Sequence, residues 1–188
     1  HNDTLIINAD DPQVKKSTAC TKSRRLTFSL SGSEHADFVV SGDWIVRRTT
    51  TGEKPLLPLA AVELTGFHML NNVLAAAAAT YAAGMEDSEA IVSALHGFRG
   101  LEHVMEPVGS IQCVRFVNDS KATSFDAAFQ SLLNYNRIYW ILGGLPKYKD
   151  QFKFNKVSKK IIKADIIGKN IPFFKKQLKR KIPYTVSN

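Results

Sequence analysis

A run of six residues, Asn118-Asp119-Ser120-Lys121-Ala122-Thr123, combines a carboxylate, an ammonium group and two hydroxyls. A carboxylate can contact a ribose or a metal ion, an ammonium group can contact a phosphate, and a hydroxyl can contact a substrate carboxylate. The same residues also suit a turn, in which the first three shape the backbone, Thr123 or Ser124 caps the next helix and Lys121 is solvated. The composition of the run leaves both interpretations open.

A second segment, Gly143-Gly144-Leu145-Pro146-Lys147, directly follows the apolar run 138–142. Glycines let a loop pass close to a ligand, and Lys147 can present its ammonium to an anion. The alternative is an ordinary turn with a surface lysine. The segment is not a Walker A loop, because G-x-x-x-x-G-K-[ST] occurs nowhere in the chain.

A third segment places His68, Asn71 and Asn72 at the head of an alanine-rich run. The first turn of a helix has free N–H groups that favour polar or anionic partners, and an asparagine there can bind the edge of a base. Histidine and asparagine at a helix start are more often capping residues, so this segment alone is a weak indication.

Hydrophobic patterning and turn residues predict the elements that hold these segments. Strands are expected over 4–8, 26–30, 38–40 and 44–48, followed by helices over 68–83 and 87–95, the second capped by Asp87 or Ser88. Beyond Gly97 we expect strands over 111–117, 138–142 and 164–167, helices over 125–133, 155–163 and 172–181, and another strand-like run from Pro183. The alternation of strand and helix is typical of an α/β fold with a mostly parallel sheet. We place a domain boundary within 96–100.

The overall composition excludes several classes of protein. The 188 residues are 44% hydrophobic and 22% charged, with two cysteines 93 positions apart, which argues against a disordered chain, a disulfide scaffold and structural zinc. No apolar run approaches the roughly 20 residues of a membrane span. We therefore expect a cytoplasmic protein without membrane partners.

The net charge of +8 comes from the C-terminal end, where residues 137–188 carry 14 Lys/Arg and 2 Asp/Glu. Four lysines (Lys156, Lys159, Lys160 and Lys163) follow helical spacing, which would form one basic face for nucleic acid. We prefer a solvated helix surface, because no RNA- or DNA-binding motif accompanies them. Nucleic acid is not an expected partner.

The motifs, taken in order, resemble the Mur ligases. The chain has Asn8-Ala9-Asp10-Asp11, Gly66-x-His68-x-x-x-Asn72 before the alanine-rich run, Gly100-Leu101-x-His103, the Asn118–Thr123 run and Gly143-Gly144-x-x-Lys147. The Asn118–Thr123 run is most similar to members that add D-glutamate. The resemblance implies the rear part of a P-loop-type central ATPase domain over 1–97, followed by a Rossmann-like C-terminal ligase domain over 98–188.

The resemblance also implies a function in peptidoglycan synthesis, with ATP and Mg²⁺ as cofactors and UDP-N-acetylmuramoyl-L-alanine and D-glutamate as substrates. Asn72 would contact the adenine, Asp119 would contact the ribose, and His68 would also bind the nucleotide. Lys121 would act as the catalytic residue near the phosphates or the reacting acyl group. Thr123 and Lys147 would hold D-glutamate, while no protein ligand for the metal is assigned.

The sequence departs from the family pattern at Met69, Val104 and Ser124, where the family has Asn, Arg and Asn. A valine cannot bind a phosphate as arginine does. Both ends read as truncations, and the N-terminal domain, the P-loop and the C-terminal end of the family are not found. We therefore expect a fragment that is inactive alone, with a separately encoded N-terminal half as one partner; a non-catalytic remnant or a basic nucleic-acid-binding module is the alternative.

Overall fold

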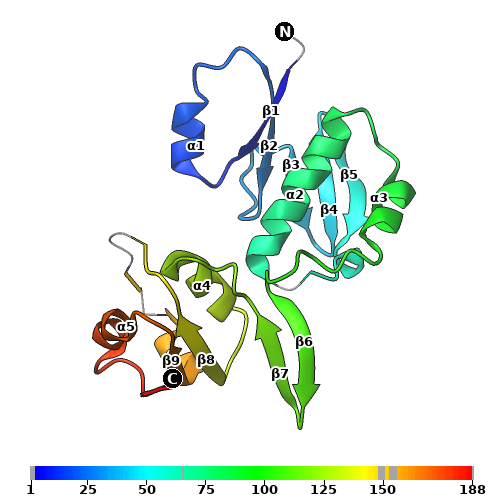
Figure 1. The fold of residues 1–188 in the computed structure, drawn as a ribbon. Coiled ribbons are helices and arrows are strands. Elements are labelled where there is room, and N and C mark those ends of the chain that lie inside the picture. Colours follow the sequence, from blue (N-terminus) through cyan, green and yellow to red (C-terminus); the bar gives the residue numbers. More distant parts are fainter. Residues whose placement is uncertain (1–2, 65, 148–150, 153–155, 188) are drawn as a thin grey trace. The chain divides into compact units, whose positions relative to one another are not determined.

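A computed structural model describes residues 3–64, 66–147, 151–152 and 156–187 (Figure 1). The chain divides into two compact units between Arg99 and Gly100. We call residues 1–99 unit 1 and residues 100–188 unit 2, and describe each by itself. None of the helices in the described ranges combines the length and apolar character needed to cross a bilayer.

Unit 1 is built on a five-stranded sheet in the order β1-β2-β3-β4-β5. The strands are β1 (Thr4–Asn8), β2 (Arg24–Ser29), β3 (Phe38–Ser41), β4 (Trp44–Thr49) and β5 (Gly52–Pro58). The first three run parallel, and β3, β4 and β5 pair antiparallel. The four strands predicted in this region are confirmed. The prediction missed β5, whose glycine and prolines oppose a strand assignment but are tolerated at the edge of a sheet.

The helices of unit 1 are α1 (Pro12–Ser17), α2 (Phe67–Ala82) and α3 (Ser88–Leu95). Helix α2 packs on β1, β2 and β3, and α3 contacts the edge strand β5 (Figure 1). The alanines of α2 are good helix formers, and their small side chains let α2 bury Leu74 and Ala78 against sheet residues such as Phe38. The predicted helices over 68–83 and 87–95 are therefore confirmed, and Asp87 caps α3 by accepting hydrogen bonds from two backbone N–H groups.

Unit 2 begins with a hairpin, β6 (Glu106–Ile111) and β7 (Val114–Asn118). The prediction of one strand over 111–117 is wrong, because Gln112 and Cys113 form a turn with φ angles of 47° and 66°. Neither residue is a glycine, so the sequence carries no usual signal for this turn. Among the described residues β7 pairs only with β6.

A three-stranded parallel sheet, in the order β10-β9-β8, forms the centre of unit 2. Its strands are β8 (Ile138–Gly143), β9 (Ile161–Ile167) and β10 (Tyr184–Val186). Helices α4 (Phe125–Leu132) and α5 (Ile171–Leu178) contribute Phe125, Leu132, Phe174 and Leu178 to one core with Leu142 and Ile166. The parallel sheet and its helices confirm the predicted α/β class.

The prediction of a helix over 155–163 is wrong for the residues of this range that the structure describes. A 3-10 turn occupies Ser158–Lys160, and strand β9 starts at Ile161; residue 155 lies outside the described residues. Ile161 is buried in the unit 2 core, and β-branched residues favour a strand. Lys159 therefore lies on a 3-10 turn and Lys163 on a strand, so the expected basic helix face does not form.

Candidate nucleotide and amino-acid site

The Asn118–Thr123 run forms the turn between β7 and α4. The sequence analysis predicted a strand before this run and a helix after it, which is correct. The preceding strand belongs to the two-stranded hairpin, however, and not to the parallel sheet. The turn therefore owes its position to the hairpin and to α4, rather than to the carboxyl edge of parallel strands.

Both carboxylate oxygens of Asp119 accept hydrogen bonds from this chain. Oδ1 accepts from the N–H of Met105 at 3.0 Å, and Oδ2 accepts from the hydroxyl of Ser131 on α4. Burial raises the pKa of the nearby Tyr135 phenol; the Arg115 charge opposes this effect and the Asp119 charge adds to it. Asp119 thus ties the turn to the segment before β6 and to α4.

His103, which the sequence analysis left without a role beyond its motif, lies against the same turn. Its Nδ1 is 2.8 Å from the amide nitrogen of Asn118, and its carbonyl accepts a hydrogen bond from the Lys121 N–H at 3.1 Å. The Glu106 carboxylate accepts a hydrogen bond from the side-chain amide of Asn118 at 3.3 Å and another from the backbone N–H of His103 at 2.9 Å. The same Nδ1 atom also lies 3.4 Å from a carboxylate oxygen of Glu106. The Gly100-Leu101-x-His103 motif was the sequence signal for this contact.

The side chains of Lys121 and Thr123 are exposed. Of the two candidate caps for α4, Ser124 is the one whose hydroxyl accepts from a helix N–H group, that of Ala127, at 3.3 Å. Thr123, just before the cap, is not needed for that bond. The turn therefore presents an ammonium and a hydroxyl to solvent at the head of α4.

Lys147 is exposed in the loop that follows β8. Gly143, the last residue of β8, packs so closely on β9 that a Cβ there would lie 2.1 Å from the carbonyl oxygen of Ile167. Gly144 has a φ of +106°, a conformation that residues with a Cβ rarely adopt. The side-chain amide of Asn170 donates to the Gly144 carbonyl at 2.9 Å. The two glycines are thus required by backbone geometry.

An aromatic cluster joins the start of α4 to the start of α5. The ring of Phe125 stacks on Phe173 with centroids 6.0 Å apart and meets Phe174 edge-on at 5.9 Å. Phe125 follows Thr123 by two positions, and Phe173 follows Asn170 by three. Because Asn170 also bonds to Gly144, the start of α5 contacts both the head of α4 and the loop after β8.

Asn72 lies exposed on α2 in unit 1, and its amide donates to the Met69 sulfur at 3.6 Å. The neighbouring Asn71 has a buried side-chain oxygen that accepts no hydrogen bond from the part of the chain described. His68 belongs to α2, but its side chain lies outside the described residues. Asn72 thus belongs to unit 1, whereas Asp119 belongs to unit 2.

No group of three or more His, Cys, Asp or Glu side chains gathers as a metal site within the described ranges. No metal role is assigned to the described residues. Mg²⁺ bound to substrate phosphates keeps few protein ligands in any case.

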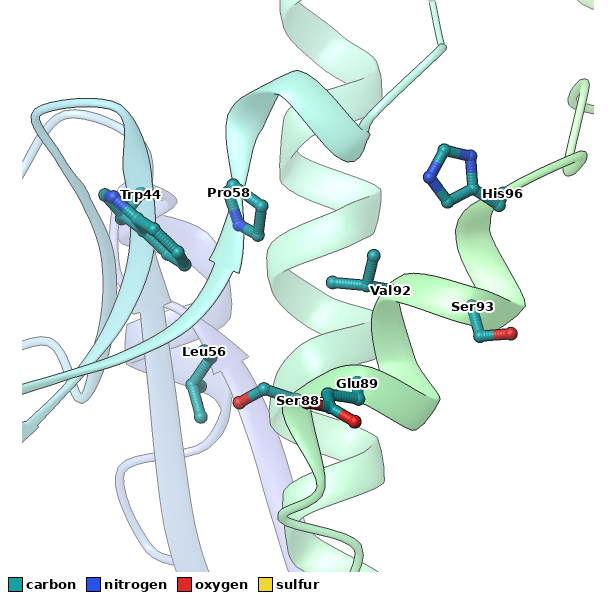
Figure 2. A pocket seen from close by; sticks show the side chains of 8 residues that line it. All are labelled: Trp44, Leu56, Pro58, Ser88, Glu89, Val92, Ser93 and His96. Carbon is teal, nitrogen blue, oxygen red and sulfur yellow. The ribbon is translucent and has the colours of Figure 1, made fainter.

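Unit 1 also contains a cavity of about 420 Å³ between β4, β5 and α3 (Figure 2). Trp44, Leu56, Pro58 and Val92 form its apolar walls, and His96 lies at the end of α3 beside it. None of the residues that the sequence analysis selected lines this cavity. The cavity follows from the packing of α3 on β5, a strand that the prediction missed.

Comparison with known proteins identifies relatives over nearly the whole chain. UDP-N-acetylmuramoylalanine--D-glutamate ligase of Chelativorans sp. is 37% identical over 190 residues, which is 99% of this chain and 40% of that protein. The enzyme of the same name from Rhizobium meliloti is 40% identical over 147 residues, which is 78% of this chain and 32% of the relative. No family model matches the chain.

Solved structures show the same fold at low sequence identity. MurF of Acinetobacter baumannii superposes with a TM-score of 0.63 and 17% identity, covering 98% of this chain and 42% of that structure. The UDP-N-acetylmuramate-alanine ligase MurC of Thermotoga maritima gives a TM-score of 0.56 and 14% identity, covering 98% of this chain and 51% of that structure. By sequence and by fold the chain therefore belongs to the Mur ligase family, and it spans 40% or less of the length of the Chelativorans and Rhizobium relatives.

Proposed function

We propose that this chain supplies the D-glutamate contacts and part of the nucleotide contacts of a ligase that joins D-glutamate to UDP-N-acetylmuramoyl-L-alanine. The names of the relatives support this reaction class. The observation that carries the proposal is the linkage, through Asn170 and the Phe125 ring, of the Thr123 turn and the Lys147 loop. Two segments with carboxylate-binding groups suit one dicarboxylic amino acid.

The residue types fit a reaction through an acyl phosphate. The acceptor carboxylate takes the γ-phosphoryl group of ATP and releases ADP; the D-glutamate amine then attacks the acyl carbon, forming the amide and releasing phosphate. Lys121 would stabilise the charge on the phosphoryl or acyl oxygens, and Lys147 and Thr123 would orient the carboxylates of D-glutamate. Asn72 and His68 would contact the adenine end of the nucleotide, and Asp119 would contact its ribose.

We assign residues 1–97 to the rear part of the central nucleotide-binding domain and residues 98–188 to the C-terminal ligase domain. The sequence has no G-x-x-x-x-G-K-[ST] loop, which supplies most of the γ-phosphate positioning in P-loop enzymes. We therefore expect D-glutamate binding by this chain without ligation. A polypeptide segment that carries the loop would complete the enzyme.

Calorimetric titration of the whole chain with D-glutamate tests the proposal, with L-glutamate as the competing ligand. We expect the unchanged chain to bind the D-isomer measurably. The affinity should fall by about tenfold or more in Lys147→Ala and in Thr123→Ala, because each change removes a contact to a charged carboxylate. The matched control is Lys159→Ala, another exposed lysine of unit 2. Equal affinity for both isomers, or full affinity in both site variants, would contradict the proposal.

The absence of ligation needs its own assay. The chain is mixed with MgATP, D-glutamate and UDP-N-acetylmuramoyl-L-alanine, and ADP release is followed with each substrate omitted in turn. We expect no release above background. Release that depends on both D-glutamate and the acceptor would show that the chain alone is an active ligase.

A further inference from the structure

Asn170 occupies the N-cap position of α5 but does not cap the helix. An asparagine at this position usually turns its side-chain oxygen back to accept from the second or third helical N–H group. Here the side-chain amide donates instead to the carbonyl of Gly144, 26 positions earlier in the sequence. The second helical residue is Pro172, which has no N–H to offer. The side chain is thus available for a contact outside its own helix.

The contact falls on a loop with unusual backbone freedom. Two consecutive glycines connect β8 to Lys147, and a glycine has more backbone states to lose than any other residue. The pairing of Gly143, the last residue of β8, with Ile167 of β9 holds the first of these glycines. The amide of Asn170 holds the second, at Gly144. Both restraints come from the β9–α5 segment.

The same segment also contacts the other half of the proposed amino-acid site. Phe173, three positions after Asn170, stacks on Phe125 next to the Thr123 turn. The β9–α5 segment is therefore the common support of the Lys147 loop and of the head of α4.

We propose that Asn170 is a positioning residue for D-glutamate: its bond to Gly144 holds the loop in the conformation in which Lys147 and Thr123 act on the same ligand. This inference rests on the proposed function. It predicts that the donor capacity of Asn170, rather than its capacity to cap α5, determines the affinity for D-glutamate.

Two variants of the whole chain separate these capacities. Asn170→Asp retains a good helix cap but loses the N–H donor and turns a carboxylate toward the Gly144 carbonyl. Asn170→Ala loses both the helix cap and the N–H donor. The variants are titrated with D-glutamate by calorimetry, and the amide resonances of Gly143 and Gly144 are followed by NMR. Lys176→Ala, an exposed change on α5, is the matched control.

We expect both Asn170 variants to bind D-glutamate about three- to tenfold more weakly, the effect of one hydrogen bond, and the two glycine resonances to shift or broaden. Unfolding by urea checks that the Asp variant retains the stability of the unchanged chain. Full affinity in Asn170→Asp, together with unchanged glycine resonances, would overturn the inference while leaving the proposed function intact. An unchanged chain that binds no D-glutamate would overturn the proposed function and, with it, the role of Asn170 in binding.

Discussion

Ser131 on α4 donates its hydroxyl to the Oδ2 atom of Asp119, closing a side-chain clamp over the turn that precedes the helix. The other oxygen of the same carboxylate holds the Met105 N–H. Asp119 therefore has a structural role in this region. Its role in holding the turn together can be measured separately from any ligand.

Removing the clamp should weaken unit 2. We expect Ser131→Ala to lower the free energy of unfolding by roughly 1 kcal/mol, because one hydrogen bond to a carboxylate is lost. The chain has two tryptophans, Trp44 in unit 1 and Trp140 in unit 2. Urea unfolding followed by the Trp140 signal in a Trp44→Phe background reports on unit 2 alone. Unchanged stability would show that the clamp contributes nothing.

The stability of unit 1 should depend on Asp10 in acid. Burial raises the pKa of Asp10, but hydrogen bonds from the hydroxyls and N–H groups of residues 29–31 outweigh it and lower the pKa from 3.8 to about 2. The folded state thus favours the charged form, so this stabilisation is complete above about pH 4 and is lost as the pH falls toward 2. We expect Asp10→Asn to reduce the stability at pH 7 by about 1 kcal/mol, because solvent screens this exposed carboxylate, and to flatten the decline in that window.

The measurement is urea unfolding at several pH values, followed by Trp44 fluorescence in a Trp140→Phe background. Asp11→Asn is the matched control, because Asp11 caps α1 and asparagine is an equally good cap. An Asp10→Asn chain that retains the full acid-dependent loss of stability would contradict the assignment.

Substitutions in the hairpin turn between β6 and β7 should raise the stability of unit 2. Gln112 and Cys113 both have positive φ angles, which asparagine and glycine adopt at lower cost. We expect the double change Gln112→Asn, Cys113→Gly to raise the stability of unit 2 by about 0.5 to 1 kcal/mol. Cys113→Val, a β-branched residue at φ of 66°, should lower it. Thermal unfolding of the three chains compares them, and a double variant less stable than the unchanged chain would contradict the turn geometry.

Two adjacent lysines, Lys159 and Lys160, should contribute differently to the free energy of unfolding. The Lys160 ammonium donates to the carbonyl of Leu133 at the C-terminal end of α4, at 2.7 Å, whereas Lys159 is exposed. A cation at a helix C-terminus stabilises the helix. We therefore expect Lys160→Ala to cost about 1 kcal/mol in urea unfolding and Lys159→Ala to cost almost nothing. Equal losses would mean that the contact to Leu133 has no particular effect.

Local signals were enough to predict much of the fold. The alanine run sets helix α2 through intrinsic propensity, and Asp87 marks the start of α3 by capping. Runs of β-favouring residues, several of them bounded by turn residues, mark β1 to β4. The order of motifs was also enough to predict the family, because that evidence lies in the linear sequence.

Other features depended on contacts between distant residues. Residues 161–163 were predicted as part of a helix that followed the lysine spacing, but Ile161 is buried in the core and pairs with β8, so these residues form a strand. The turn at Gln112 and Cys113 lacks the usual residues and is held by the pairing of β6 with β7. The bond from Asn170 to Gly144 and the clamp from Ser131 to Asp119 join residues 26 and 12 positions apart. The amino-acid sequence by itself determined which chemical groups are present and which helices can form, because both are local properties. Only the tertiary structure decided which groups meet, because side chains far apart in sequence become neighbours when the core packs.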